Sequence, residues 1–414
     1  MRAMKDGRFG KGAKLAVLTT LLMEAVLLTG CWDRREVNNM AVITAAAIDK
    51  AGDTNIELSV QVFNPRTAGG GQQGTMNGSG GSSGSGGVSE GSQVIVRSEV
   101  GATMAEAMSK LQMKLSRHIF WGHGEIFIIG EELARKGFRE HVDFLLRSPE
   151  IRDNADIFIS KGPAKQVLIL PIPLERSSAQ MLRGLTDLHL GIETSIVSLS
   201  QMLAGKAGAA VVPLVQYGKS EEKNDGNIPY PNGAGIVKKD KLIGFLDEET
   251  MRGAMWIRNE IDLATVTVTP ARTGRGFVTV RLVRSETELL PRIEHGEWSV
   301  TVKSKAEGDM LQNTTNVDFS NPVLSGELER ELAEAVASRM KEAIGTVQNK
   351  MNADIFGFSE AFHRSYPKQW NKAKDRWDEM FPRVKTVIET DVKILRQGLS
   401  DPGALRTKEE VQSE

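Results

Sequence analysis

The sequence predicts an α+β fold of several domains, with mixed sheets, packed helices and a long C-terminal helix across a β-rich block. The first indication is that segments with the two-residue alternation of strands and segments with the helical spacing of apolar residues follow one another in irregular order. The second is the composition, which at 40% hydrophobic and 25% charged residues is ordinary for globular domains. The third is the length, because 414 residues are enough for two domains or slightly more.

Residues 1–30 have the three regions of a secretory signal peptide. Five basic residues come first, then an apolar run of 14 residues at 15–28, and then the small residues Thr29 and Gly30. The run is shorter than the ~20 residues that a helix needs to cross a bilayer. It therefore predicts an export signal and not a permanent span, although Glu24 inside it weakens its apolar character.

Cys31 is the predicted site of lipidation. Leu28, Thr29, Gly30 and Cys31 form a bacterial lipobox, in which the cysteine thiolate accepts a diacylglycerol group before cleavage and Cys31 then becomes the N-acylated first residue. Two acyl chains, at ~0.8 kcal/mol per buried methylene, anchor a protein stably to membrane lipid where one chain is marginal. The alternative is an amphipathic N-terminal helix with Cys31 as a buried structural residue.

The charge and the cysteine content exclude several classes of protein. Without the signal peptide, 47 basic and 51 acidic residues remain. This slight acidic excess argues against nucleic-acid binding, which needs a strongly basic face. Because Cys31 is the single cysteine, the exported part can form neither a disulfide nor a thiolate metal site. Its stability must come from an apolar core, which several hundred residues can supply.

Residues 32–200 are predicted to form the first domain. Alternating apolar residues predict strands, and apolar residues three or four apart predict helices. The expected strands are 40–48, 56–63, 93–100, 124–129 and 155–160, the expected helices are 103–117, 131–136, 138–147, 178–190 and 196–203, and 165–170 is a further apolar run. A tract of Gly, Ser and Gln at 68–92 has almost no apolar content, so it is expected to be a disordered loop inside this domain.

Residues 209–400 are predicted to form the second domain, with a subdivision near residue 260 as an option. A charged, Pro-rich segment at 221–231 is expected to be a loop, and 248–258 a helix. The expected strands are 209–216, 233–238, 241–246, 264–269, 277–283, 288–294, 298–305 and 384–395.

A long helix is predicted from Asn321 to about Met351. Asn321 is a capping residue, and Pro322 fits the first helical position because its φ is already set. The apolar residues after Pro322 are three or four apart, while the opposite side is charged. Such a helix is expected to pack across a sheet, and binding of a partner protein by its apolar face is the alternative.

No catalytic, cofactor-binding or metal-binding residues are predicted. Gly218, Lys219 and Ser220 resemble the end of a phosphate-binding loop, but Pro213 stands where the required earlier glycine would be. His118 and His123 are five residues apart, which does not place two imidazoles on one helix face as a zinc site would require. They are therefore interpreted as structural.

Three charged residues lie close together after the helix predicted at 138–147. Arg147, Glu150 and Arg152 are interpreted as a buried ion network, with a patch for a partner protein as the alternative. The acidic pairs at 131–132 and 248–249 come at predicted helix starts, where negative charge is stabilised by the helix dipole.

Five stretches of the chain carry a family resemblance. They are Cys31-Trp32-Asp33 with Glu36, 118–130 around Trp121 and His123, 147–152, 233–246, and 352–358 with Trp370, Trp377 and Phe381. Together they resemble the Ger(x)C family of C subunits of nutrient germinant receptors in endospore-forming bacteria. The resemblance covers nearly the whole chain after the signal peptide, and it depends on the order of the motifs more than on any one of them. The Gly/Ser tract after Phe63 is longer than this family leads us to expect.

The resemblance implies a non-enzymatic lipoprotein on the outer face of the spore inner membrane. It implies an unusual multi-domain α+β fold without a cofactor, and membrane subunits A and B as the partners in triggering spore germination. Two other classes remain open. A solute-binding lipoprotein would deliver a small nutrient to a transporter, but two similar halves joined by a hinge are not visible. A surface hydrolase would need a nucleophile with a base in register, and none is visible.

Overall fold

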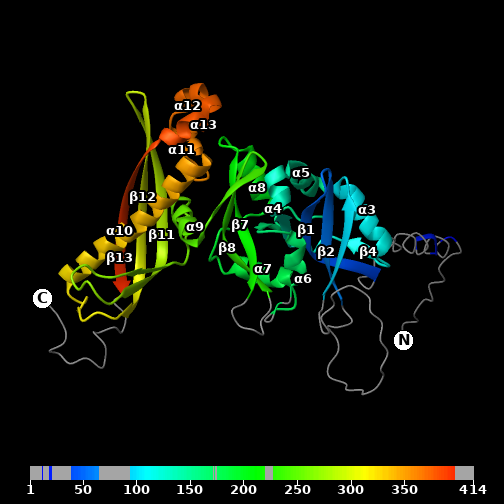
Figure 1. Cartoon of the computed structure of the whole chain (residues 1–414), viewed down its shortest axis with the longest axis horizontal. Coiled ribbons are helices and arrows are strands. Elements are labelled where there is room, and N and C mark those ends of the chain that lie inside the picture. Colours follow the sequence, from blue (N-terminus) through cyan, green and yellow to red (C-terminus); the bar gives the residue numbers. More distant parts are fainter. Residues whose placement is uncertain are drawn as a thin grey trace, which may run out of the picture.

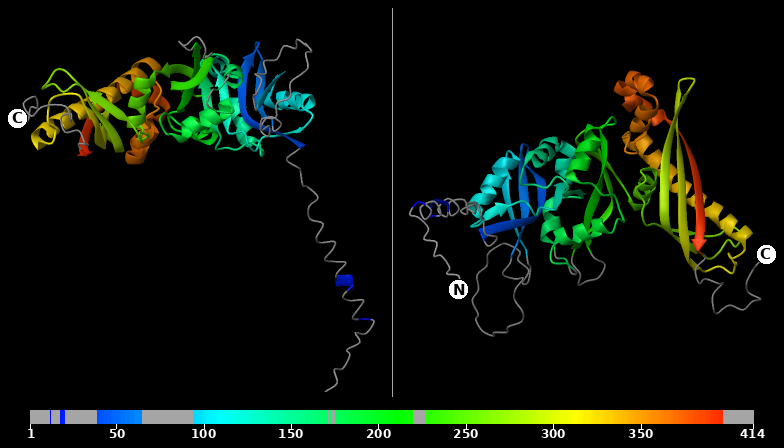
Figure 2. Two further views of the ribbon diagram at one scale, coloured as in Figure 1. Left: turned by 90° about the horizontal axis from the view of Figure 1, so that it is seen from below. Right: turned by 180° about the vertical axis from the view of Figure 1, so that it is seen from behind.

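The computed structural model describes residues 39–64, 94–170, 172, 175–219 and 227–396, together with Gly12 and residues 18–20. Two mixed β-sheets with packed helices lie side by side along the long axis of the molecule (Figure 1; Figure 2). This arrangement confirms the predicted α+β class. Cys31, nearly all of the predicted signal peptide and the tract at 68–92 lie outside the described residues.

The first sheet has nine strands in the order β3-β2-β1-β5-β6-β7-β8-β9, with β4 paired to β1 beside this path. Its centre, β1-β5-β6-β7, is parallel, and both ends are antiparallel. The strands are β1 (Met40–Ala51), β2 (Asn55–Phe63), β3 (Val94–Gly101), β4 (His118–Phe120), β5 (Ile126–Gly130), β6 (Asp156–Ser160), β7 (Ala209–Lys219), β8 (Asn227–Lys238) and β9 (Lys241–Leu246).

Short helices connect these strands, as parallel pairing requires. They are α3 (Met104–Lys114), α4 (Glu131–Lys136), α5 (Arg139–Arg147), α6 (Ala164–Ile169), α7 (Ser178–Asp187) and α8 (Ile196–Ala204). Helix α9 (Glu248–Ile257) follows β9 and leads from the first sheet to the second. None of the described helices combines the length and the apolar character that crossing a bilayer demands.

The second sheet has four strands in the order β10-β11-β12-β13. The strands are β10 (Thr265–Val268), β11 (Val278–Glu294), β12 (Glu297–Asn313) and β13 (Lys385–Arg396), and the helices after β12 are α10 (Pro322–Thr346), α11 (Phe358–Ser365), α12 (Pro367–Ala373) and α13 (Trp377–Met380). The sheet pairs antiparallel except for β12 and β13, which are parallel. The crossover between these two parallel strands contains these four α-helices, together with a π-helical turn at Val347–Met351 and two short 3₁₀-helices.

Helix α10 crosses the second sheet diagonally (Figure 1), which confirms the predicted packing. Asn321 caps it by accepting a hydrogen bond from the Val323 amide, and Pro322 opens it. Its apolar stripe is buried, from Leu324 to Ile344. Two contacts tie it to β13, because Thr390 donates to the Ala333 carbonyl at 2.9 Å and Glu329 accepts from the Ile394 amide at 3.0 Å.

One strand of the second sheet was wrongly predicted as two. Strand β11 is continuous from Val278 to Glu294, and a bulge lies between Leu282 and Arg284. Before the bulge the even-numbered residues face the core, and after it the odd-numbered ones, such as Leu289, do so. The extra residue of a bulge shifts the alternation by one position, and in the sequence this shift has the same appearance as a loop.

Three shorter segments add to or differ from the prediction. The apolar run at 165–170, for which no element was predicted, is helix α6, whose first amides, at Ala164 and Lys165, donate to the buried Asp49 carboxylate of β1 at 2.7 and 2.8 Å. Residues 227–231 belong to β8 and not to a loop. Strand β4 has three residues, too few for a visible alternation.

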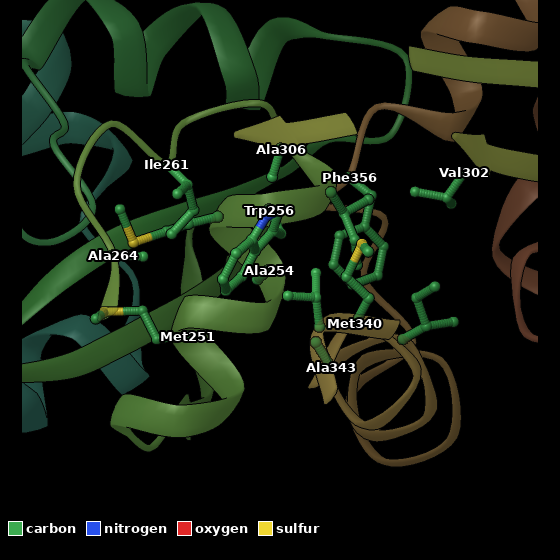
Figure 3. Packing of buried hydrophobic residues seen from close by; sticks show 14 of the residues in the cluster. Met251, Ala254, Trp256, Ile261, Ala264, Val302, Ala306, Met340, Ala343 and Phe356 are labelled. Carbon is green, nitrogen blue, oxygen red and sulfur yellow. The ribbon is translucent and has the colours of Figure 1, made fainter. Parts of the chain in front are cut away.

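The two sheets share one apolar core. This cluster contains Val211 and Ile236 of the first sheet, Val300 and Val302 of the second, and Trp256 of α9, which has no exposed surface. Figure 3 shows Trp256 beside Met340 and Ala343 of α10. Helix α9 is therefore the element through which the first sheet packs on α10. The division predicted between 200 and 209 falls within the first sheet, and the sheets change after α9, near the optional subdivision at 260.

Helix α7 is tied to the first sheet by two polar contacts. The Arg183 guanidinium lies 3.2 Å from the Asp156 carboxylate at the start of β6, and buried Gln61 of β2 donates to the Ser178 hydroxyl at 3.0 Å. Burial raises the pKa of Asp156 to about 6, against the opposing effect of Arg183. The buried carboxyl is thus costly to ionise even with its partner.

We predict that Gly253→Ala destabilises the protein. A Cβ atom at Gly253 of α9 would lie 2.3 Å from the Arg339 carbonyl oxygen of α10, so the helices would have to separate. Overpacking of this kind costs about 1–3 kcal/mol. Urea unfolding followed by tryptophan fluorescence measures the loss. Gly326→Ala in α10 is the control, because a Cβ there meets nothing within 4 Å and should stabilise the helix by up to about 1 kcal/mol. Equal effects of both substitutions would contradict the close crossing.

We also predict that Asp156 makes folding stability depend on pH. Its folded pKa of about 6 lies above the ordinary aspartate value of 3.8, so the unfolded chain loses this proton first as the pH rises. Stability from this group therefore falls between about pH 4 and 6, by at most about 3 kcal/mol. The measurement is urea unfolding between pH 4.5 and 7. Asp156→Asn should reduce the change of the free energy of unfolding with pH, whereas Asp153→Asn, at an exposed neighbour, should leave that change as in wild type. The same pH dependence in wild type and Asp156→Asn would contradict the raised pKa of Asp156.

Candidate functional site

The one predicted site residue, Cys31, lies outside the described residues, so its lipidation stays a prediction. Strand β1 begins nine residues later, at Met40. The first sheet thus starts close, along the chain, to the predicted anchor.

The two histidines near Trp121 make separate local contacts. His118 in β4 has its Nδ1 atom 2.9 Å from the Gln112 side-chain oxygen, and His123 packs edge-on against the ring of Phe120. Among residues of the described ranges, no group of three or more His, Cys, Asp or Glu side chains is arranged to hold a metal ion. Gly218 and Lys219 pair with β8 as part of a regular strand, which is not the backbone of a phosphate-binding loop.

The interpretation of Arg147, Glu150 and Arg152 as a buried ion network is wrong. All three are exposed. Arg147 pairs with Asp143 one helical turn earlier at 2.8 Å, and Arg152 is 4.0 Å from Glu125. Exposed pairs of this type contribute about 0–1 kcal/mol. The alternative interpretation, a surface patch for a partner, is the one that the geometry leaves open.

Two of the stretches that carry the family resemblance meet between the sheets. Lys238, in the hairpin of β8 and β9, donates to the Asn352 carbonyl at 2.5 Å and pairs with Asp378 at 2.9 Å. Arg258, directly after α9, donates to the Ile355 carbonyl and binds the Glu260 carboxylate at 2.6 and 2.8 Å. The segment 352–358 is therefore held against the first sheet and α9 by two cations, one from the hairpin of β8 and β9 and one from the end of α9.

Asp354 organises that segment. Its carboxylate is buried and accepts hydrogen bonds from the amides of Gly357, Phe358 and Ser359 and from the indole of Trp377, at 2.7 to 3.2 Å. Burial raises the pKa of Asp354, while these amide donors oppose the rise. Trp377 in turn packs against the rings of Phe362, Trp370 and Phe381, so the carboxyl group of Asp354 is linked to the aromatic cluster through one indole.

A cleft lies between helix α7 and the first sheet, and we call it the α7 cleft. Its volume is about 530 Å³, within the range of small-ligand sites. Its walls come from segments far apart in the sequence: Val42 and Thr44 of β1, Phe63 and Val94 at the ends of β2 and β3, His123 and Glu125 before β5, and Glu175, Arg176, Ser177, Ala179, Gln180, Arg183, Gly184 and Asp187 in and before α7.

Charge concentrates along the α7 wall. Arg183 reaches two carboxylates, Asp156 at 3.2 Å and Asp187 at 3.3 Å. Glu125 also lines the cleft, its carboxylate is 4.0 Å from Arg152, and its backbone carbonyl accepts the Asp156 amide at 2.8 Å. The sequence did not identify these residues as a site. The signal available was Asp156 itself, a carboxylate that opens an otherwise apolar strand whose five residues are all buried.

Two family models match the chain. The model described as "Spore germination protein N-terminal domain" matches residues 33–217, and "Spore germination B3/ GerAC like, C-terminal" matches 232–398. Together they cover most of the chain. The N-terminal match ends inside β7 and the C-terminal match starts inside β8, so neither corresponds to one complete sheet.

Curated proteins of Bacillus subtilis (strain 168) are similar over nearly their whole length. Spore germination protein KC is 27% identical, over 93% of this chain and 96% of its own. Putative spore germination protein YfkR is 28% identical, over 91% and 95%, and spore germination protein B3 is 25% identical, over 93% and 98%.

A solved structure shares the fold. The crystal structure of the GerBC protein aligns with a TM-score of 0.55 at 19% identity, over 85% of this chain and 97% of that chain. At this identity the likeness concerns the fold alone. The assignment of the chain to a family therefore depends on the two family models, which match in order along the chain. The matched family is not a known enzyme family. The chain belongs to the Ger(x)C family of spore germination proteins.

Proposed function

We propose that this protein is the lipid-anchored C subunit of a nutrient germinant receptor, acting with membrane subunits A and B to trigger spore germination without catalysing a reaction itself. The observation that carries the proposal is the match of both family models in order along the chain. The lipobox at Cys31 supports an anchor on the outer face of the spore inner membrane.

The length of chain after the anchor sets how the protein would sit. Met40, the first residue of β1, is nine positions after Cys31. Fully extended, this length of chain spans at most about 30 Å. The first sheet would therefore lie at the bilayer surface, within reach of membrane-embedded partners.

A solute-binding lipoprotein is the competing proposal, and the α7 cleft is the observation that favours it. Against it, the two sheets have nine and four strands with different orders. They are not the two similar halves around a hinge that such proteins use to close on a solute. The receptor subunit therefore has the better support.

Cys31→Ala should release the protein from the membrane fraction of spores and impair nutrient germination, because both acyl chains are lost. Fractionation with immunoblotting and germination assays in the native host measure the two effects. Thr29→Ser keeps a small residue before Gly30 and is the control that should stay anchored. Unchanged germination with a released protein would refute the anchored-subunit proposal.

The exposed segment around Arg147 and Arg152 is expected to contact a partner subunit. Charge reversal of both residues should reduce co-purification of the A and B subunits several-fold, because charge complementarity across an interface is inverted. The free energy of unfolding should change by less than about 1 kcal/mol. Arg139→Glu, at an exposed arginine of α5 outside this segment, is the control. If both variants co-purify equally with wild type, the contact lies elsewhere.

A further inference from the structure

We propose that a basic patch on α11, α12 and the 3₁₀ turn after them binds the anionic headgroups of a lipid bilayer. We call it the α12 patch, and it consists of Arg364, Lys368, Lys372, Lys374 and Arg376. The inference deepens the proposed receptor role, because the choice of a lipid surface rests on the predicted anchor at Cys31. The charge and the placement of the patch do not depend on that anchor.

The cations of the α12 patch are not neutralised by the protein. All five are exposed, and among the described residues none of them has a carboxylate within ion-pair distance. Helices α11–α13 and the turns between them contain four carboxylates. Glu360 accepts hydrogen bonds from within the protein, and Asp378 pairs with Lys238 at 2.9 Å. Asp375 and Glu379 are thus the two carboxylates left in these helices against five cations.

The spacing of the cations is unfavourable for the folded protein by itself. Lys368 and Lys372 are one helical turn apart on the side of α12 that is opposite the buried Trp370. Like charges at this spacing destabilise a helix. Lys368 also lies in the first turn, where a cation opposes the helix dipole.

Other helices of the same chain have the opposite arrangement. Helices α3, α4, α5, α7 and α9 each pair opposite charges four residues apart. The α12 patch instead repeats a cation every four residues, at 364, 368, 372 and 376. A departure from a local rule that the rest of the chain follows is typical of functional sites. An anionic partner would relieve the repulsion.

A rigid base holds the α12 patch. Trp370 is buried, with its ring 5.1 Å from that of Trp377, and Phe362 of α11 is 5.8 Å from the same ring. The Trp377 indole donates to the buried Asp354 carboxylate at 3.2 Å. These contacts fix α11 and α12 before any partner arrives. Binding then needs little ordering of the backbone, which favours affinity.

A bilayer is the polyanion that the predicted anchor would hold beside the α12 patch. Each Lys or Arg near an anionic bilayer strengthens binding roughly fivefold, and a polybasic patch is one of the second signals that stabilise attachment by an acyl chain. Figure 1 shows α12 beside the second sheet, whereas β1, the first strand after the anchor, is in the first sheet. Contacts at both places would lay the long axis of the protein along the bilayer.

Vesicle binding by the unlipidated protein tests the α12 patch. The probe is the processed chain from residue 31 with Cys31→Ser, which contains both sheets because β1 begins at Met40. It should co-sediment with vesicles containing phosphatidylglycerol at least a hundredfold more tightly than with pure phosphatidylcholine. High salt should remove the preference. The chain has 47 basic and 51 acidic residues, so net charge does not predict this result. Equal binding to both vesicles, or a preference that salt leaves unchanged, overturns the proposal.

This test is separate from that of the receptor role. Because the probe carries no acyl chain, its failure would refute the α12 patch and leave the outcome of Cys31→Ala in spores unaffected. Failure of the Cys31→Ala prediction would likewise not change the binding of the unlipidated chain to anionic vesicles.

Substitutions within the patch locate the binding. Lys368→Gln with Lys372→Gln should lower the affinity for anionic vesicles at least tenfold, and adding Arg364→Gln and Arg376→Gln should remove nearly all of the preference. Urea unfolding shows that each variant is folded. The double variant should be at least as stable as wild type, because the repulsion along α12 is relieved. It decides the test if the fourfold variant does not fold.

A matched control removes the same charge elsewhere. Arg139→Gln, Lys161→Gln, Lys303→Gln and Lys341→Gln together take four exposed cations from separate elements and should lower the affinity less than threefold. Equal losses in the two fourfold variants would show a general effect of charge and refute the patch. Unchanged vesicle binding of the patch variant, with loss of the A and B subunits on co-purification, would assign the patch to an acidic partner protein and also overturn the proposal.

Discussion

The crossing of α9 and α10 is the constraint on which the arrangement of the two sheets depends. The helices approach so closely that Gly253 has no room for a Cβ atom, and the same crossing buries Trp256 completely. One apolar cluster then extends from β7 and β8 through α9 to the second sheet. Apolar burial is non-directional and does not by itself fix how the two sheets are oriented relative to each other. Directional contacts come from Lys238 and Arg258, which donate hydrogen bonds to carbonyl groups of 352–355.

The sequence predicts local elements well where one period persists. Helix α10 is the clearest case, because its cap, its proline and its stripe agree with one another. The sequence fails where tertiary contacts decide. Helix α6 is only six residues long, and its first amides are satisfied by Asp49, which lies more than a hundred residues earlier in the chain. In β11 the bulge changes the phase of the alternation, so that one strand has the pattern of two.

The strand order of the first sheet and the walls of the α7 cleft also depend on contacts between segments far apart in the sequence, which local patterns do not reveal. The predicted boundary lies between residues 200 and 209, and the strand after it, β7, pairs with β6 in parallel and continues the first sheet. The cleft is lined by parts of β1, β2, β3, the loop before β5 and the α7 region. No motif spacing can reveal such a site, because its residues become neighbours only when the strand order is known. Asp156 is the exception, since a carboxylate in an apolar strand needs a partner.

Strand β1 connects the features that matter for function. It is the first strand after the predicted anchor, it pairs with β2, β4 and β5, and its buried Asp49 caps α6. Its residues Val42 and Thr44 line the α7 cleft, and Thr44 also donates to Gln61, which supports α7. The cleft therefore borders the strand that follows the predicted anchor most closely along the chain.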